Sequence, residues 1–187
     1  MKRLVVGISG ASATIYGIRL LEVLKGTDVE THLVISAAAK KLILLETDFR
    51  VEEVETMANY VYDIDDIGAA IASGSFKTDG MVIIPCSIKS LSAIANSYTA
   101  NLLQRAADVT LKERRRLVAV VRETPLHRGH LELMLRATDM GAIIFPPLPA
   151  FYHHPKTVED IVYHTVGRVL DLFDVDHALF KRWDGQM

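Results

Sequence analysis

The stretch Leu4-Val5-Val6-Gly7-Ile8-Ser9-Gly10-Ala11-Ser12 decides the fold of this chain. Its first part, Leu4–Ile8, is apolar without alternation, as is typical of a strand buried on both faces of a parallel sheet. The small residues that follow predict a tight turn into a helix. Backbone N–H groups at such a helix start bind phosphate, and Ser12 adds a hydroxyl donor. A plain strand–helix turn is the alternative, because the stretch matches neither G-x-G-x-x-G nor a P-loop.

Further apolar runs alternate along the chain with segments of helical period. The other predicted strands are Thr31–Ile35, Gly80–Pro85, Leu117–Val121 and Ala142–Phe145. The predicted helices are Ala13–Lys25, Ala37–Leu45, Val51–Tyr60, Ser87–Ser97, Asn101–Arg114, Leu131–Met140 and Thr157–Phe173, the last with Thr157 and Asp160 as a near-capping-box. Such alternation indicates right-handed βαβ units. We therefore expect a three-layer α/β/α, Rossmann-like, doubly wound parallel sheet, forming a single domain over residues 1–187 with a C-terminal helical arm.

Composition and charge exclude several classes of protein. The 187 residues are 50% hydrophobic and 24% charged, with a formal net charge of -2, which argues against disorder and against nucleic-acid binding. No apolar run is long enough for a membrane span or a signal peptide. The single cysteine, Cys86, excludes an internal disulfide, so we expect a cytoplasmic protein. One basic run is predicted to be a solvated helix end, or to give one phosphate contact: Lys112, Arg114, Arg115 and Arg116.

In a doubly wound sheet, ligands bind beyond the carboxyl ends of the strands. The second strand ends in Ser36-Ala37-Ala38, without an acid to hold a ribose 2′-hydroxyl, which disfavours NAD and favours a mononucleotide such as FMN. The run Pro85-Cys86-Ser87-Ile88-Lys89-Ser90 puts serines and a lysine at another helix N-terminus, a second anion site. Cys86 is interpreted as a packed small residue, with a nucleophile of lowered pKa as the alternative.

Two further groups of polar residues are candidate sites. Arg122-Glu123-Thr124-Pro125 follows a buried strand, where an arginine and a carboxylate serve either a ligand or each other as an ion pair. His127 and His130 lie three apart and His153-His154 are adjacent, but no Cys/His spacing typical of a metal site supports them. We therefore expect no metal, and histidines that are surface or hydrogen-bonded residues.

The order of the motifs along the chain is informative. From Met1 to about Trp183 the chain carries G-I-S-G-A-S, Leu45-Glu46-Thr47, P-C-S-I-K-S, N-L-L-Q-R-A-A-D-V, L-K-E-R, V-R-E-T-P-L-H and P-P-x-P-A-F-Y. In this order they resemble the UbiX-type flavin prenyltransferases, within the larger family of flavin-containing cysteine decarboxylases. The resemblance implies transfer of a dimethylallyl group from dimethylallyl phosphate, as the mono- or diphosphate, to N5 and C6 of reduced FMN. It also implies a UbiD-type decarboxylase as recipient of the product, a place in ubiquinone biosynthesis, and a homododecamer.

The resemblance also implies roles for particular residues. FMN would be held by Gly10, Ala11, Ser12, Ser36, Ser87, Ile88, Lys89, Ser90 and Arg122. The prenyl phosphate would be surrounded by Arg105, Lys112, Glu123, Tyr152 and Arg168. Catalysis would fall to Ser12, Glu46, Lys112 and Glu123, with Ser12 and Glu46 near the reacting flavin edge. Cationic donors stabilise a departing phosphate without a metal, and Ser12, Glu46 and Glu123 are the candidates for proton transfer.

Three positions depart from the family pattern, and two other functions are alternatives to the one that the resemblance implies. Ala13 and Ser97 stand where glycine is usual, and Ser90 replaces a usual threonine. An FMN-dependent cysteine decarboxylase on the same fold is expected to carry a P-A-S-A-N-T-like motif in place of P-C-S-I-K-S. A flavodoxin-like electron carrier would not need the charged set Arg105, Lys112, Glu123 and Arg168.

Overall fold

Six parallel strands form one sheet in the order β3-β2-β1-β4-β5-β6 in the computed structural model, which describes residues 1–183 and 185. The strands are β1 (Arg3–Ile8), β2 (Glu30–Ile35), β3 (Tyr60–Tyr62), β4 (Gly80–Cys86), β5 (Arg116–Val121) and β6 (Ala142–Ile144). Because the winding direction reverses between β1 and β4, the carboxyl ends of these two strands flank the position where doubly wound sheets bind ligands.

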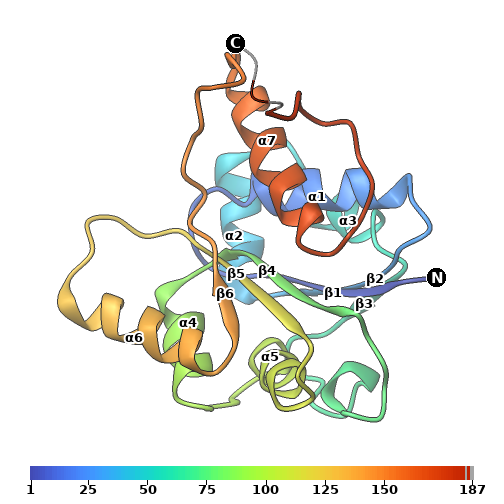
Figure 1. Ribbon diagram of the computed structural model, residues 1–187. Coiled ribbons are helices and arrows are strands. Elements are labelled where there is room, and N and C mark those ends of the chain that lie inside the picture. Colours follow the sequence, from blue (N-terminus) through green and yellow to red (C-terminus); the bar gives the residue numbers. More distant parts are fainter. Residues whose placement is uncertain (184, 186–187) are drawn as a thin grey trace.

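Helices cover both faces of the sheet (Figure 1). One face carries α1 (Ile15–Lys25), α2 (Ala37–Glu46), α3 (Val51–Glu55) and α7 (Val158–Asp171). The other face carries α4 (Ile88–Ala95), α5 (Leu102–Lys112), α6 (Arg128–Asp139) and the short 3-10 helix η1 (Ala70–Ala72). The expected three-layer, doubly wound architecture is confirmed. Within the described residues, no helix has the length and apolar character that a membrane span requires.

The central strand β4 explains why the sequence shows apolar runs rather than alternation. All of its residues are buried. Val82 and Ile84 pack into the cluster that contains α1 and α7, whereas Met81 and Ile83 pack into the cluster that contains α4 and α5. Successive side chains of a strand point to opposite faces, so a strand covered on both sides needs apolar residues at every position.

The predicted helix over Val51–Tyr60 is wrong in its second half. The helix α3 ends at Glu55, and Tyr60 begins β3, a short edge strand that the sequence analysis missed. A strand at the sheet edge has one pairing neighbour and leaves Tyr60 and Val61 exposed, so it shows no apolar run. The rings of Tyr60 and Tyr62 stack on His32, which helps to hold β3 against β2.

The C-terminal helix α7 is an integral part of one helical layer. Its residues Val162, Val166 and Leu170 are buried in the same core cluster as α1. At the start of the helix, Thr157 and Asp160 form the capping box that their spacing indicated. The chain after α7 turns back along the helix, as Figure 1 shows, and Arg182 there forms an ion pair with Asp171 at 2.6 Å.

Two of the positions that depart from the family pattern adopt backbone angles that favour glycine. Ala13 has φ +76° and Ser97 has φ +52°, both in the left-handed region. A non-glycine residue there costs about 1 kcal/mol. The chain therefore keeps the turn geometry for which glycine is usual at both positions, at a small cost in stability.

Candidate active site

A cavity of about 290 Å³ opens beyond the carboxyl ends of β1, β2 and β4, at the point where the strand order reverses. Five residues expected to hold the cofactor line it: Gly10, Ser36, Ser87, Lys89 and Ser90. The loop after β3 and the start of α5 contribute the rest of its polar wall. The cavity occupies the place where open α/β sheets bind their ligands.

Three helices begin at this cavity, and each has a side-chain N-cap. Ser36 Oγ accepts from the N–H of Ala39 at 3.1 Å, Ser87 Oγ from Ser90 at 3.2 Å, and Asn101 Oδ1 from Gln104 at 3.0 Å. The first turns of α2, α4 and α5 therefore meet around one space. Free N–H groups and helix dipoles favour an anion there, and Lys89 adds a full positive charge.

Serine side chains join the β1–α1 loop to the start of α4. Ser9 Oγ donates to the carbonyl of Pro85 at 3.0 Å and accepts from the N–H of Ser87 at 2.8 Å. The hydroxyl of Ser87 donates to Ser90 Oγ at 3.2 Å. Because Ser90 accepts in this bond, its own hydroxyl proton is available to a ligand. Ser9, which is buried and was not predicted as a site residue, holds the two loops together.

Gly10 permits a close approach between the β1–α1 loop and α2. A Cβ atom at this position would lie 2.5 Å from the Cβ of Ala38, well inside van der Waals contact. Any side chain would push the loop away from the first turn of α2. The glycine therefore shapes the wall of the cavity by allowing this approach to α2.

The start of α1 binds a carboxylate from within the chain. Glu46, at the end of α2, accepts from the N–H of Ala13 at 2.8 Å and from that of Thr14 at 3.4 Å. This contact holds Glu46 against the two residues that follow Ser12. It also occupies the N–H groups that the sequence analysis assigned to a phosphate. The geometry therefore favours an anion at α2, α4 and α5 rather than at the first strand–helix turn.

Arg122 and Glu123 follow β5 at the same edge of the sheet. Both side chains are exposed, and no ion pair joins them among the residues that the structure describes, so the ion-pair alternative is not supported. Glu123 accepts from the N–H of Thr124 at 3.1 Å. Burial raises the pKa of Tyr16 in α1, and a hydrogen bond with Thr165 and the charge of Arg122 oppose this rise.

Cys86 is not a nucleophile in this structure. The residue is fully buried at the end of β4, and burial raises the pKa of its thiol to about 12. A protonated thiol without access to solvent reacts slowly with electrophiles. The interpretation of Cys86 as a packed small residue is confirmed.

Arg105 and Lys112 lie away from this cavity within the chain. Both are on α5, which begins at the cavity, and Lys112 at its far end is about 16 Å from the start. Arg105 donates to the carbonyl of Ala72 at 3.2 Å, and Lys112 pairs with Glu113 at 2.5 Å. One chain does not bring these two cations to the residues at the carboxyl edge.

Tyr152 and Arg168 meet at a third place, on the outer side of α7. They line a cavity of about 300 Å³ together with Asp171, Phe180, Arg182 and Trp183. Arg168 Nε lies 3.5 Å from a carboxylate oxygen of Asp171, one turn further along the helix. The C-terminal segment thus contributes a second arginine, Arg182, which the sequence analysis did not include.

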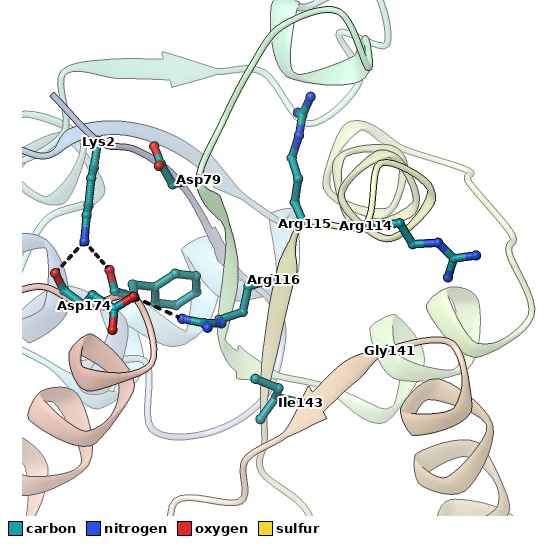
Figure 2. A pocket seen from close by; sticks show the side chains of 9 residues that line it. Lys2, Asp79, Arg114, Arg115, Arg116, Gly141, Ile143 and Asp174 are labelled. Atoms are coloured by element: carbon teal, nitrogen blue, oxygen red, sulfur yellow. Dashed lines mark hydrogen bonds and ion pairs between the residues drawn. The ribbon is translucent and has the colours of Figure 1, made fainter.

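The remaining members of the basic run surround a groove at the opposite, amino edge of the sheet, shown in Figure 2. Arg115 turns away from the groove and donates to the carbonyls of Gly74 and Phe76 at 2.7 and 2.8 Å. Arg116 lies 3.7 Å from a carboxylate oxygen of Asp174. Arg115 is therefore bound within the protein, whereas the longer Arg116–Asp174 pair is exposed to solvent.

Six residues that line the cavity at the carboxyl edge were not among the expected site residues: Ala37, Ala38, Ile64, Asp65, Asn101 and Gln104. Ile64 and Asp65 follow β3, the strand that left no sequence signal, and Asp65 puts a carboxylate into a pocket where none was expected. The N-cap pattern of Asn101, three residues before Gln104, could have revealed a third helix N-terminus at this edge.

The histidines do not form a metal centre in the described part of the chain. No group of three or more His, Cys, Asp or Glu residues has the geometry to hold a metal ion among residues 1–183 and 185. His127 caps α6 by accepting from the N–H of Gly129 at 3.0 Å, and its ring lies over that of His130.

Comparison with known proteins agrees with this geometry. The flavoprotein family model matches residues 1–170. The flavin prenyltransferase UbiX of Thauera aromatica is 60% identical over 98% of this chain and 94% of its own length. A crystal structure of AnUbiX (PadA1) with FMN and dimethylallyl pyrophosphate has a TM-score of 0.98, with 49% identity over 100% of this chain and 99% of that one. A dodecameric FMN-dependent UbiX-like decarboxylase from Escherichia coli O157:H7 has a TM-score of 0.96, with 49% identity over 98% and 100%.

The doubly wound sheet, with its cavity at the β1/β4 switch point, and the match to the flavoprotein family define a flavoprotein of the α/β class. Within that class, the chain belongs to the UbiX family of flavin prenyltransferases and is an enzyme.

Proposed function

We propose that this chain transfers the dimethylallyl group of dimethylallyl phosphate to N5 and C6 of reduced FMN, and that a UbiD-type decarboxylase uses the product. The relative that binds FMN and dimethylallyl pyrophosphate, at 49% identity, supports both substrates. The observation that carries the proposal is the cavity where three helix N-termini and Lys89 meet, because it offers a phosphate several donors at once. A cytoplasmic location is proposed as well, since the single cysteine forms no internal disulfide.

The cavity fits the phosphate and ribityl chain of FMN. Ser36, Ser90 and Lys89 would bind the phosphate, while Gly10 and its neighbours Ala11 and Ser12 allow close approach. Asp65 is an acceptor suited to a ribityl hydroxyl, a role that no cation in the cavity can fill. When bound, reduced FMN supplies an electron-rich N5 and C6. Of the remaining members of the proposed cofactor set, Ser87 also lines this cavity, Ile88 follows Ser87 at the start of α4, and Arg122 follows the end of β5.

The side chains proposed for the prenyl phosphate are divided among three parts of one chain. Glu123 lies at the carboxyl edge, Arg105 and Lys112 lie along α5, and Tyr152 and Arg168 lie on the outer side of α7. A complete site therefore requires neighbouring copies of the chain. The dodecameric relative supports such an assembly, and we propose a homododecamer in which α5 and α7 of neighbouring copies complete the site.

Each proposed phosphate-binding cation has an acid beside it on its own part of the chain. Arg105 pairs with Asp108 at 3.0 Å, Lys112 with Glu113 at 2.5 Å and Arg168 with Asp171 at 3.5 Å. These partners orient the cations and limit their mutual repulsion before the phosphate binds. When the allylic C–O bond breaks, negative charge grows on the departing phosphate, and preorganised cations stabilise that charge.

Ser12, Glu46 and Glu123 are proposed to handle protons at the reacting edge. Glu46 is held at the start of α1 by the N–H groups of Ala13 and Thr14, the two residues that follow Ser12, which supports this proposal. A held carboxylate next to a hydroxyl is an arrangement suited to passing a proton. Glu123 follows Arg122 after the end of β5, and the phosphate released from the prenyl donor can share the proton transfer with it.

Mass spectrometry of the flavin tests the proposal directly. Purified protein is incubated anaerobically with reduced FMN and dimethylallyl phosphate, and in a parallel sample with the diphosphate. The flavin should gain the mass of one dimethylallyl group with at least one of the two donors. An unchanged flavin with both donors would contradict the proposal. Because the dodecameric relative is named a decarboxylase, loss of carbon dioxide from a cysteinyl peptide is measured in the same samples.

FMN should bind much more tightly than NAD or FAD. The cavity at the β1/β4 switch point offers one cluster of anion donors, and β2 ends without the acid that holds an NAD ribose. Calorimetry with the three compounds checks this, with riboflavin as a control for the contribution of the phosphate. Tight NAD binding would show that the cavity has been assigned to the wrong ligand.

Prenyl transfer should continue when divalent metal ions are removed. Arginine and lysine side chains are proposed to neutralise the departing phosphate, the task that Mg²⁺ performs elsewhere. Turnover is measured in buffer with and without a chelator, using the mass of the flavin as readout. A loss of turnover that Mg²⁺ restores would contradict this role for the cations.

A further inference from the structure

Tyr152 is hydrogen-bonded to a buried histidine. Its hydroxyl oxygen lies 2.7 Å from Nε2 of His164, on the second turn of α7. His164 is 6% exposed, its ring is stacked on His153 at 4.4 Å and 6°, and Phe180 lies 4.6 Å from it on another side. The imidazole is therefore fixed in place, whereas Tyr152 reaches from the loop before α7 into the cavity that it shares with Arg168.

The direction of this hydrogen bond decides what Tyr152 offers to a ligand. If the phenol donates to His164, only oxygen lone pairs face the cavity, and these repel an anion. If His164 donates through Nε2–H, the phenol proton is free to turn toward the cavity. A phosphate beside Arg168 needs donors, so only the second arrangement helps to bind it.

We infer that His164 is a positioning residue: by donating from Nε2 to the oxygen of Tyr152, it turns the phenol proton into the cavity beside Arg168, where Tyr152 donates to the phosphate of the prenyl substrate. The inference rests on the proposed function, because it takes the prenyl phosphate as the occupant of this cavity.

The surroundings of His164 are compatible with that donor role. Burial lowers the pKa of His164, the neighbouring His153 and Arg168 lower it further, and Asp171 opposes them. A lowered pKa favours the neutral imidazole, which carries one N–H, and the inference places this proton on Nε2. The ring of Phe180, which lies against His164, brings no charge to this proton.

A set of four variants tests the inference. His164→Leu removes the donor at similar volume, His164→Gln retains an amide N–H, Tyr152→Phe removes the phenol oxygen, and the last variant combines His164→Leu with Tyr152→Phe. Affinity for inorganic pyrophosphate is measured by calorimetry on the FMN-loaded protein, together with kcat and KM for prenyl transfer. His164→Leu and Tyr152→Phe should each weaken pyrophosphate binding about tenfold, His164→Gln should stay close to the wild type, and the double variant should be no weaker than Tyr152→Phe.

Three other outcomes of this experiment separate the positioning role of His164 from a packing role and from the proposed function. If His164→Leu weakens binding as much in the Tyr152→Phe background as in the wild type, His164 acts through packing and the inference fails. A His164→Gln protein with wild-type thermal stability but the full loss of affinity also overturns it. If the pyrophosphate pattern holds while the wild type leaves the flavin unchanged, the proposed function fails and the positioning role stands.

Discussion

Arg168→Ala is expected to slow prenyl transfer by about a hundredfold or more while FMN affinity stays nearly unchanged. Arg168 lies on the outer side of α7, away from the cavity proposed for FMN, so its loss should not disturb the flavin. Its charge is proposed to stabilise the departing phosphate, and that contact is strongest in the transition state. Turnover by the mass of the flavin and FMN affinity by calorimetry are measured on the same preparation.

A matched control separates the charge of Arg168 from a general effect of removing an arginine. Arg50→Ala removes an exposed arginine that pairs with Glu53 on the short helix α3, and it should leave both measurements unchanged. An equal loss of FMN binding and turnover in Arg168→Ala would mean that this face of α7 is structural. Tyr152 and Arg168 would then no longer count as substrate-binding residues.

Co-assembly of two inactive variants is expected to restore activity. Ser12→Ala and Lys112→Ala should each abolish most turnover when present in every subunit. If a site takes Ser12 from one copy and Lys112 from another, half of the positions of each kind are intact in an equal mixture, and about a quarter of the sites are complete. This result is motivated by the position of Lys112 at the far end of α5, away from the β1–α1 loop that carries Ser12. Activity of the co-expressed, purified mixture is compared with that of each variant alone.

The double variant provides the control for this experiment. Wild type co-assembled with Ser12→Ala/Lys112→Ala should also reach about a quarter of wild-type activity if the site is shared between copies. If each copy instead held a complete site, the first mixture would stay inactive, whereas the second would keep about half of the activity. That pair of results would refute a site completed by neighbouring subunits.

Local features of the sequence were sufficient to determine the fold class. The apolar runs at β1, β4 and β5 predicted buried parallel strands, because a strand covered on both faces needs apolar side chains at every position. Thr157 and Asp160 predicted the start of α7, since a capping box involves residues only three apart. The edge strand β3 was not predicted from the sequence, because it is short, pairs on one side and needs no apolar run.

The arrangement of the candidate site depended on contacts between distant residues. Composition and periodicity do not show that Glu46 binds the N–H of Ala13, 33 residues away, or that α5 begins at the same cavity as α2 and α4. The motif resemblance proposed Arg105, Lys112, Tyr152 and Arg168 as one group, but the chain places them on two different surfaces. The sequence by itself determined the sheet, most of its helices and the residue types for phosphate chemistry, because strand burial and capping depend on near neighbours. Only the tertiary structure decided which of those residues meet within one subunit, because that depends on how the crossovers place each helix end around the sheet.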